Sequence, residues 1–270
     1  MRPGGPLVRR GVFLLFFAAS SLLFAGSAMR AACESPLQGE GQVSAVLDAR
    51  TLRLDDGREV RLSGIEIPKT VETSGADWLR QHVLHQKMAL HGLDDMPDRY
   101  GRQHIFARLD GRTETLQGAL IEAGYAIAAG NTSDKACLTE LRETERRAEN
   151  ARRGIWSRTD FVHDAGRPDE ILKYMGRFTL VEGTILSARQ AGATLYLNFS
   201  KRRIQGFAVT ISRRMMLGFA AADMTAATLQ GQRVRVRGWI SQHGGPRIEA
   251  RFPSQIEFTS NTKAAMAEGK

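Results

Sequence analysis

The chain has 270 residues, of which 42% are hydrophobic and 25% are charged. This length suits one large domain or two ordinary ones, and the apolar content is sufficient for packed cores, which excludes wholesale disorder. The charged fraction excludes a protein with several membrane spans. Two cysteines exclude a zinc ribbon or a scaffold of several disulfides. The formal net charge of +9 indicates an anionic partner, although a total does not locate the charge.

Residues 1–28 have the pattern of a cleaved export signal. Three arginines within the first ten residues precede an apolar stretch at 12–24, and small residues follow at 26–28. The apolar stretch is shorter than the roughly 20 residues that a membrane span needs. We therefore expect a periplasmic or secreted protein without a transmembrane span after cleavage. The alternatives are an uncleaved anchor and a lipoprotein signal that ends before Cys33.

Cys33 and Cys137 are the two cysteines of the chain. In an oxidising compartment an even pair favours a disulfide over two free thiols. A bridge between them would close a loop of about 100 residues and stabilise the protein by about 3–5 kcal/mol in the loop-entropy model. We expect it to join the N-terminal segment to the start of a helix.

Residues 39–158 predict a first domain of five short strands and three helices. Alternation of apolar and polar residues indicates strands at 43–46, 51–54, 60–65, 87–91 and 103–109. Helical spacing predicts helices at 76–84, 115–123 and 133–153. Ser133 is the expected cap of the last helix, and Gly154 is its expected end.

A linker and a second domain are predicted after residue 158. Residues 159–174 carry Gly, Pro and several charges without periodicity, which indicates a linker. Residues 175–260 predict strands at 178–188, 194–199, 207–211, 232–240 and 247–258, with a short helix at 213–222. The predicted fold class is α+β, mainly β with helices, built from two small five-stranded OB-like barrels, with a β-sandwich as the alternative for the second. Residues 261–270 are expected to form a frayed tail.

Residues 41–157 resemble the staphylococcal nuclease, or thermonuclease, family across nearly the whole of its domain. The strings that carry the resemblance follow the family's order: Val43 to Leu54, Val60-Arg61-Leu62, Gly64 to Pro68, Asp98-Arg99-Tyr100-Gly101-Arg102, Leu120 to Ala126, the glutamate-rich helix around Glu145, and Gly154-Ile155-Trp156. The C-terminal segment, through Tyr196 to Phe199 and Val236 to Ile240, resembles an extension that follows this domain in some exported bacterial proteins.

The resemblance implies phosphodiester hydrolysis by three kinds of group. A calcium ion is bound by carboxylates, a glutamate positions or deprotonates water, and two arginines hold the phosphate. Arg61 and Arg102 match the two arginines. Asp48 matches the first aspartate of the family's metal loop, and Glu66 matches a calcium aspartate further along the chain.

Two departures place cations where the family has carboxylates. Arg50 stands at a direct calcium ligand, and Lys69 stands at the catalytic glutamate. A unit charge about 4 Å away contributes about 4 kcal/mol at an effective dielectric near 20, and a divalent ion doubles this figure. We therefore expect no calcium cofactor and no calcium-dependent hydrolysis by the family mechanism.

The cations that remain admit two interpretations. They either form an anion site that needs no metal, made of Arg50, Arg61, Lys69 and Arg102, or Arg50 and Lys69 pair with Asp48 and Glu66 in a self-neutralised remnant.

Net charge differs sharply between the two predicted domains. Residues 39–158 carry 18 basic and 19 acidic side chains, whereas residues 175–258 carry 12 basic and 4 acidic ones, a net of +8. Phosphate neutralisation dominates nonspecific affinity for nucleic acid, so the second domain is the expected binder. Arg233, Arg235 and Arg237 alternate along one predicted strand, which places three guanidinium groups on one face. The alternative is a merely solvated face.

The aromatic residues of the second domain supply a candidate stacking surface. Leu195, Leu197 and Phe199 are expected to point inward, which leaves Tyr196 on the opposite face, where it can stack on a base. Trp239 and Phe207 are expected in the core.

These features favour an exported nuclease-like protein with a degenerate calcium site. We expect its basic C-terminal domain to bind nucleic acid or another anionic polymer. One alternative is an active phosphodiesterase with a rearranged site. The other is an envelope scaffold whose basic face binds anionic lipid or glycan.

Overall fold

The computed structural model describes residues 1, 33, 35–132, 134–201 and 204–259. The expected tail at 261–270 and all of the expected export signal except Met1 lie outside these residues. Residues 1–30 separate from residues 31–270, and the account below concerns the second unit. No helix among the described residues is long and apolar enough to cross a membrane. The described chain combines helices with several sheets, which confirms the α+β class.

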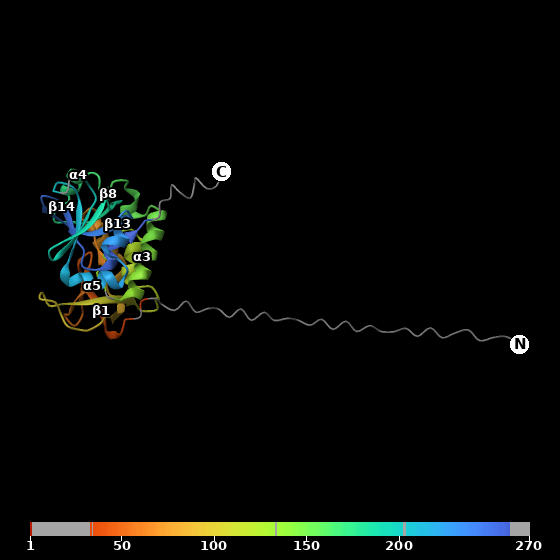
Figure 1. The fold of residues 1–270 in the computed structure, drawn as a ribbon. Coiled ribbons are helices and arrows are strands. Elements are labelled where there is room, and N and C mark those ends of the chain that lie inside the picture. Colours follow the sequence, from red (N-terminus) through yellow and green to blue (C-terminus); the bar gives the residue numbers. More distant parts are fainter. Residues whose placement is uncertain (2–32, 34, 133, 202–203, 260–270) are drawn as a thin grey trace. The chain divides into compact units, whose positions relative to one another are not determined.

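Five strands close into a barrel in the first part of the chain (Figure 1). Their order is β1-β2-β3-β6-β5. The bounds are β1 (Leu37–Asp48), β2 (Thr51–Leu54), β3 (Glu59–Leu62), β5 (Lys87–His91) and β6 (Arg102–Leu109). Strand β1 pairs with β5 through its first half and with β2 through its second half, so one long strand closes the barrel. The five predicted strands are confirmed.

Three helices accompany the barrel, as predicted. They are α1 (Glu72–Val83), α2 (Leu116–Glu122) and α3 (Lys135–Asn150). The cap of α3 is Asp134, whose carboxylate accepts a hydrogen bond from the backbone N–H of Cys137 at 3.0 Å. The predicted cap, Ser133, lies outside the described residues. Two 3₁₀ turns, η1 (Lys69–Val71) and η2 (Gly154–Ser157), and a short pair of strands, β4 (Ile65–Glu66) and β7 (Ile127–Ala128), complete this domain.

The glycines of two family strings lie against each other. A Cβ atom on Gly124 would lie 2.3 Å from the carbonyl oxygen of Arg153, and one on Gly154 would lie 2.3 Å from the carbonyl oxygen of Gly124. Both residues also have positive φ angles, 77° and 49°. Only glycine fits such an approach, which explains why each string contains one.

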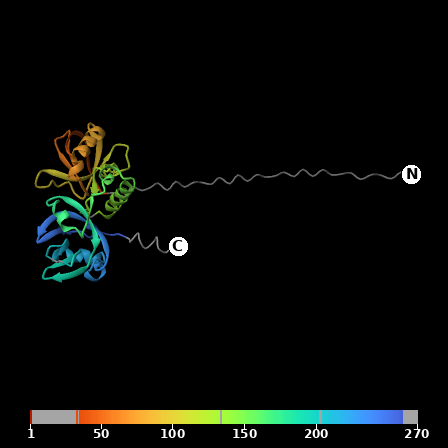
Figure 2. The same ribbon diagram turned by 90° about the horizontal axis from the view of Figure 1, so that it is seen from above.

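The second β structure is an eight-stranded sheet rather than the predicted five-stranded barrel. Figure 2 shows it (cyan to blue) apart from the barrel (red to yellow). The strand order is β10-β11-β12-β14-β13-β9-β8, and β15 pairs with β13. The bounds are β8 (Val162–Asp164), β9 (Phe178–Thr184), β10 (Ser187–Ala191), β11 (Thr194–Asn198), β12 (Ala208–Ser212), β13 (Arg233–His243), β14 (Gly245–Glu249) and β15 (Ile256–Phe258). Helices α4 (Pro168–Leu172), α5 (Arg213–Ala221) and α6 (Ala226–Leu229) accompany the sheet.

The strand count rises from five to eight because two predicted strands are each divided in two and because β8 lies in the segment predicted as a linker. The stretch 178–188 separates into β9 and the start of β10, and the stretch 247–258 separates into β14 and β15. In the second case a 3₁₀ turn at Pro253–Gln255 interrupts pairing, since proline has no N–H to donate to a ladder.

The segment 159–174, predicted as a linker, is part of the second domain. Strand β8 pairs in parallel with β9, and Ala165 and Ile171 are buried in the core of the sheet. The linker prediction is wrong because a three-residue strand and a five-residue helix are too short to show a period.

Two separate cores fill the barrel and the sheet, and a third cluster joins them. Ile155 and Trp156 of η2 and Leu180 of β9 belong to this third cluster. In the core of the sheet, Phe207 is buried as predicted. Trp239 is 55% exposed, so its assignment to the core is wrong. It alternates along β13 with buried Gly238 and Ile240 and therefore lies on the outer face.

Candidate functional site

Arg50, at the turn after β1, is engaged by Glu66 of β4. Its Nη1 atom lies 2.6 Å from Oε1 of Glu66 and donates a hydrogen bond to the carbonyl oxygen of Ile65 at 2.5 Å. Its backbone N–H donates to the carboxylate of Asp48 at 2.7 Å. The guanidinium group thus neutralises the carboxylate that matches a calcium aspartate of the family.

Arg61 of β3 lies close to two other arginines. Its Nη1 atom donates to Oγ1 of Thr51 at 2.9 Å and lies 3.8 Å from Oδ2 of Asp48. Burial lowers the pKa of Arg61, and the charges of Arg50 and Arg102 lower it further. Three guanidinium groups therefore stand near one another: those of Arg61 and Arg102, which match the family's two arginines, and that of Arg50, which departs from the family.

Arg102, at the start of β6, is held by Asp98. Its Nε and Nη2 atoms both donate to Oδ2 of Asp98, at 3.1 and 2.7 Å. The same oxygen lies 3.2 Å from Nε2 of His104. Hydrogen bonds from the Arg102 side chain, and then from backbone N–H groups, hold the pKa of Asp98 well below its usual range. Asp98 was named above only within a family string, and His104 was not named, although the three residues of this cluster lie within seven positions of the chain.

Lys69 does not join the other three cations. A cavity of about 260 Å³ is lined by Arg50, Arg61, Glu66 and His104, among others, but not by Lys69. Lys69 is exposed and lines a smaller hollow of about 50 Å³ with residues of the second domain. The four cations predicted as one anion site are therefore divided between two places.

Carboxylates lie beside all three arginines, of which Arg50 and Arg61 line the cavity and Arg102 does not. Glu66 pairs with Arg50 and Asp98 pairs with Arg102, while Asp48 lies near Arg61. No ion pair of Lys69 occurs among the described residues. In the part of the chain that the structure describes, no three His, Cys, Asp or Glu side chains are arranged to hold a metal ion.

Arg237, predicted on a solvent-facing strand, is buried against helix α3. Its side chain is 1% exposed. Its Nη1 atom lies 2.9 Å from Oε2 of Glu145 and donates to the carbonyl oxygen of Ala128 at 2.6 Å. Its Nη2 atom lies 3.3 Å from Oε2 of Glu257. This arginine joins the second sheet to the nuclease-like part of the chain.

Arg235 makes a similar junction. Its Nη1 and Nη2 atoms donate to the two carboxylate oxygens of Glu149 at 2.7 and 2.8 Å, and its Nε donates to Glu182 at 2.6 Å. Arg233 is half-exposed and lies 3.6 Å from Glu182. The three arginines do share one face of β13, but the prediction that this face is free for an anionic polymer is wrong. Acidic residues of α3 at positions 145 and 149 already neutralise most of it.

Tyr196 of β11 lies in a different, unneutralised setting. It pairs across the sheet with Arg189 of β10, and the guanidinium carbon of Arg247 lies 5.6 Å from the centre of its ring. These three residues and His243 help to line a cavity of about 290 Å³, and its described lining residues include no Asp or Glu. The Nε atom of Arg247 is buried and has no hydrogen-bond partner among the described residues. We refer to this cavity as the Tyr196 groove.

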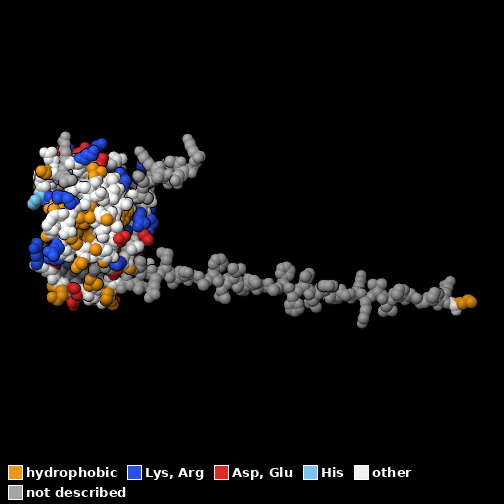
Figure 3. Space-filling model, in the orientation of Figure 1, with side chains coloured by type: hydrophobic (Ala, Val, Ile, Leu, Met, Phe, Trp, Pro, Cys, Tyr) orange, Lys and Arg blue, Asp and Glu red, His pale blue; other side chains and the backbone are white. Residues whose placement is uncertain are grey.

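Arg189 and Arg247 were missed by the sequence reasoning. A signal for Arg189 was available, because Gly192 and Ala193 form the two-residue turn between β10 and β11 and fix the pairing of Arg189 with Tyr196. Arg247 reaches the groove through a parallel pairing of β12 with β14, which no local pattern indicates. Figure 3 shows Lys and Arg side chains in separate groups on the face drawn, not in one continuous patch.

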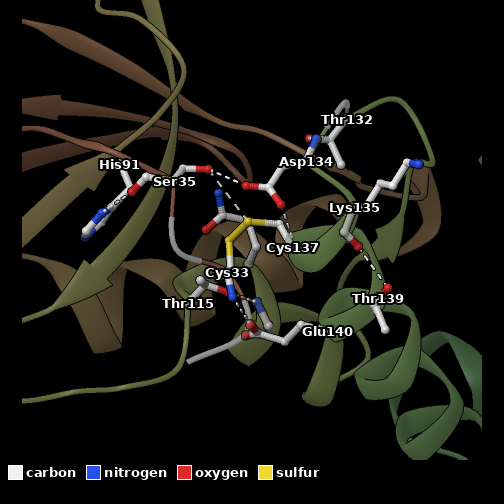
Figure 4. Close-up of a disulfide and its surroundings, with 12 residues drawn as sticks. Cys33, Ser35, His91, Thr115, Thr132, Asp134, Lys135, Cys137, Thr139 and Glu140 are labelled. Atoms are coloured by element: carbon white, nitrogen blue, oxygen red, sulfur yellow. Dashed lines mark hydrogen bonds between the residues drawn. A yellow bond between two sulfur atoms is a disulfide. The ribbon is translucent and has the colours of Figure 1, made fainter. Parts of the chain in front are cut away.

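A disulfide joins Cys33 to Cys137, as predicted (Figure 4). Cys137 lies in the first turn of α3, and both cysteines are buried. The backbone N–H of Cys33 donates to Glu140 at 3.0 Å, and Oγ of Ser35 donates to Asp134 at 2.7 Å. The bridge and these bonds fasten the segment before β1 to helix α3.

Comparisons with known proteins agree with the first domain. Residues 59–158 match the model of the family described as Staphylococcal nuclease homologue. The chain therefore contains a staphylococcal nuclease-like domain.

One curated relative is the Thermonuclease of Staphylococcus hyicus. It is 25% identical over 128 residues, which cover 43% of this chain and 75% of that protein. The family match ends before β8, so the second sheet lies outside it.

Proposed function

We propose that the protein binds nucleic acid through the Tyr196 groove of its second sheet. The observation that carries the proposal is the set of side chains that line the groove: an aromatic ring and two guanidinium groups, with no carboxylate among the described lining residues. By contrast, acidic side chains pair with Arg50 and Arg102 of the nuclease-like domain. Acidic side chains also pair with Arg235 and Arg237 of β13. A polyanion gains most from cations that have no competing partner.

The proposed ligand is single-stranded. Tyr196 can stack only on a base whose face is free, and stacking on an aromatic side chain is the usual way in which proteins hold single strands. Arg189 and Arg247 flank the ring and would bind the neighbouring phosphates. His243, at the end of β13, adds a further donor.

We also propose that the nuclease-like domain does not use calcium. Calcium requires six to eight oxygen ligands, with carboxylates prominent among them. Here Arg50 stands at one ligand position and pairs with Glu66, the carboxylate at another. The residues present do not fit the ion, so no catalytic step is derived through it. An active phosphodiesterase with a rearranged site is the competing proposal.

Export to the periplasm or the exterior belongs to the same proposal. A buried disulfide that closes the chain over 104 residues suits an oxidising compartment.

The binding test uses the full chain, because the second sheet does not stand apart from the first domain. A fragment that starts at residue 175 would lack β8 and α4 and would leave Arg237 without Glu145. Binding of labelled oligodeoxythymidylate is measured by anisotropy at several salt concentrations. We expect Tyr196→Ala to weaken binding by about 1–3 kcal/mol at an unchanged salt slope, because stacking releases no counterions.

The matched control is Arg53→Gln, which removes an exposed arginine paired with Glu59 on the barrel, and it should leave affinity unchanged. If the unaltered chain does not bind the oligonucleotide at low salt but binds anionic vesicles or glycans, the nucleic-acid proposal is wrong. The envelope scaffold is then the better interpretation. Hydrolysis of DNA or RNA that requires calcium and is abolished by a chelator would refute the proposal that the nuclease-like domain does not use calcium.

A further inference from the structure

Trp239 is an exposed aromatic side chain on the same sheet as Tyr196. It is one of three tryptophans in the chain, and 55% of it is exposed, whereas Trp156 is 7% exposed. Its ring meets Phe178 of the neighbouring strand β9 edge to face, with centroids 5.9 Å apart at 81°. Phe178 contacts the indole edge to face, and more than half of the Trp239 surface remains exposed to a ligand.

The pairing register places Trp239 and Tyr196 on one face and nearly at one level. Tyr196 pairs with Thr210 of β12, and Thr210 pairs with Glu249 of β14. The next ladder pairs Ile248 with Ile240, so Trp239 comes beside Glu249. Paired residues point to the same side of a sheet. Three strand spacings of about 4.8 Å separate the two rings, a distance of about 14 Å.

Arginines lie over the Tyr196 ring and near the backbone beside Trp239. Arg247 lies over Tyr196 and pairs with Ser241, two residues from Trp239 on β13. The backbone N–H of Ile240, the residue after Trp239, donates to the carbonyl oxygen of Arg177, whose exposed guanidinium group lies 5.8 Å from the centre of the Tyr174 ring. Glu249 is the acidic residue between the rings, and Arg251 lies 3.5 Å from its carboxylate.

We propose that Trp239 is a second base-stacking position, so that one single strand crosses the outer face of the sheet from Tyr196 to Trp239. This inference rests on the proposed function. At the 3.4 Å rise of a stacked strand, about 14 Å corresponds to about four nucleotide steps. A dinucleotide reaches one ring, whereas a strand of twelve nucleotides reaches both.

The test combines tryptophan fluorescence with affinities for oligothymidylates of two and twelve nucleotides. In the full chain, the twelve-nucleotide strand quenches fluorescence because it stacks on the exposed indole. Trp239→Ala lowers affinity for the twelve-nucleotide strand by about 5- to 150-fold, the range of one stacking contact, and leaves affinity for the dinucleotide within twofold. Tyr196→Ala weakens binding of both lengths.

Trp239→Phe separates stacking from a structural role. It keeps an aromatic face, so affinity for the long strand stays within a few-fold, but the quenching is lost. Trp78→Phe keeps the quenching, since Trp78 is engaged by His82 in a stacked pair. Leu217→Ala removes an exposed apolar side chain of α5 and serves as the control without effect.

Two outcomes would overturn the inference. If Trp239→Ala leaves the affinity for twelve nucleotides unchanged while Tyr196→Ala weakens it, the strand does not reach Trp239, and the Tyr196 groove still stands. If quenching by the long strand persists in Trp239→Phe, the indole that responds is a different one. Failure of the proposed function itself is distinct, because then neither oligonucleotide binds the unaltered chain.

Discussion

The cavity of the nuclease-like domain and the Tyr196 groove both contain arginines, but in opposite states of charge balance. Arg50 and Arg102 each have a carboxylate within hydrogen-bonding distance, and Arg61 lies near Asp48. Arg189 and Arg247 line a groove in which no carboxylate occurs among the residues that the structure describes. The comparison teaches that the number of cations in a segment does not determine its affinity for an anion. What matters is how many of them have no partner within the protein.

Arg237 provides the strongest test of this distinction, because it is the most deeply buried of the paired arginines described above. Arg237→Met leaves Glu145 buried without its counter-charge, and we expect the free energy of unfolding to fall by about 3–5 kcal/mol. Urea unfolding measures the change. Arg233→Met, on the same face but half-exposed, is the control and should stay within about 0.5 kcal/mol. A loss below about 1 kcal/mol for Arg237→Met would mean that water reaches Glu145.

The disulfide gives the next largest expected effect. Replacing Cys33 and Cys137 with serine removes a cross-link over 104 residues, and we expect a loss of about 2–4 kcal/mol in stability. The midpoint of denaturant unfolding reports it. The unaltered chain should show no free thiol when it is labelled without reductant, and two labelled thiols per chain would contradict the bridge.

Binding by the groove should depend on Arg247 and not on Arg61. Each phosphate neutralised on a single strand contributes about 0.7 to the log-log slope of affinity against salt. Arg247→Gln should flatten the slope by about that amount, which corresponds to about fivefold in affinity over a tenfold change in salt. Arg61→Gln should leave it unchanged. The reverse result would locate the anion site in the nuclease-like cavity.

His163 of β8 predicts a modest dependence of stability on pH. Burial lowers the pKa of His163, against the opposing charges of Asp160 and Glu170. The unfolded chain therefore binds its proton more readily than the folded one, and stability falls as the pH drops below about 6.5, with a slope below the one-proton limit of about 1.36 kcal/mol per pH unit. His163→Phe keeps a ring against Tyr174 and should show a flatter profile between pH 7.5 and 5.5. If the unaltered chain and His163→Phe show the same pH dependence of stability, His163 does not contribute to it.

The smallest expected effect is that of calcium. A ligand that binds only the folded state raises the melting temperature by mass action. Because Arg50 pairs with Glu66, millimolar calcium should leave the melting temperature unchanged. Magnesium serves as the comparison, and a reproducible rise with calcium alone would contradict the proposed loss of the site.

Local patterns predicted the barrel well. Its strands and helices have clear periods, and the family strings fix their order, so the five strands and the three helices were found within a few residues. What covers the side chains of Arg235 and Trp239 was not predicted. Period two places residues on one face of a strand but does not say what covers that face. For Arg235 the cover is α3, and for Trp239 no described element buries the ring.

The candidate site shows the same limit. Arg61 and Arg102 could be assigned by their place in the family strings, but the separation of Lys69 from them depends on the path of η1 toward the second domain. Likewise, the charge count pointed to the second domain, but it could not tell neutralised arginines from free ones.

The pairing between α3 and β13 has a consequence for the time course of folding. Glu145 precedes Arg237 by 92 residues, and Glu149 precedes Arg235 by 86. At a synthesis rate of roughly 5–20 residues per second, about 90 residues take roughly 5–20 s. Helix α3 is therefore complete several seconds before its arginine partners exist, and two carboxylates that end up neutralised must first be hydrated. The junction between barrel and sheet thus forms late, only after β13 has been made.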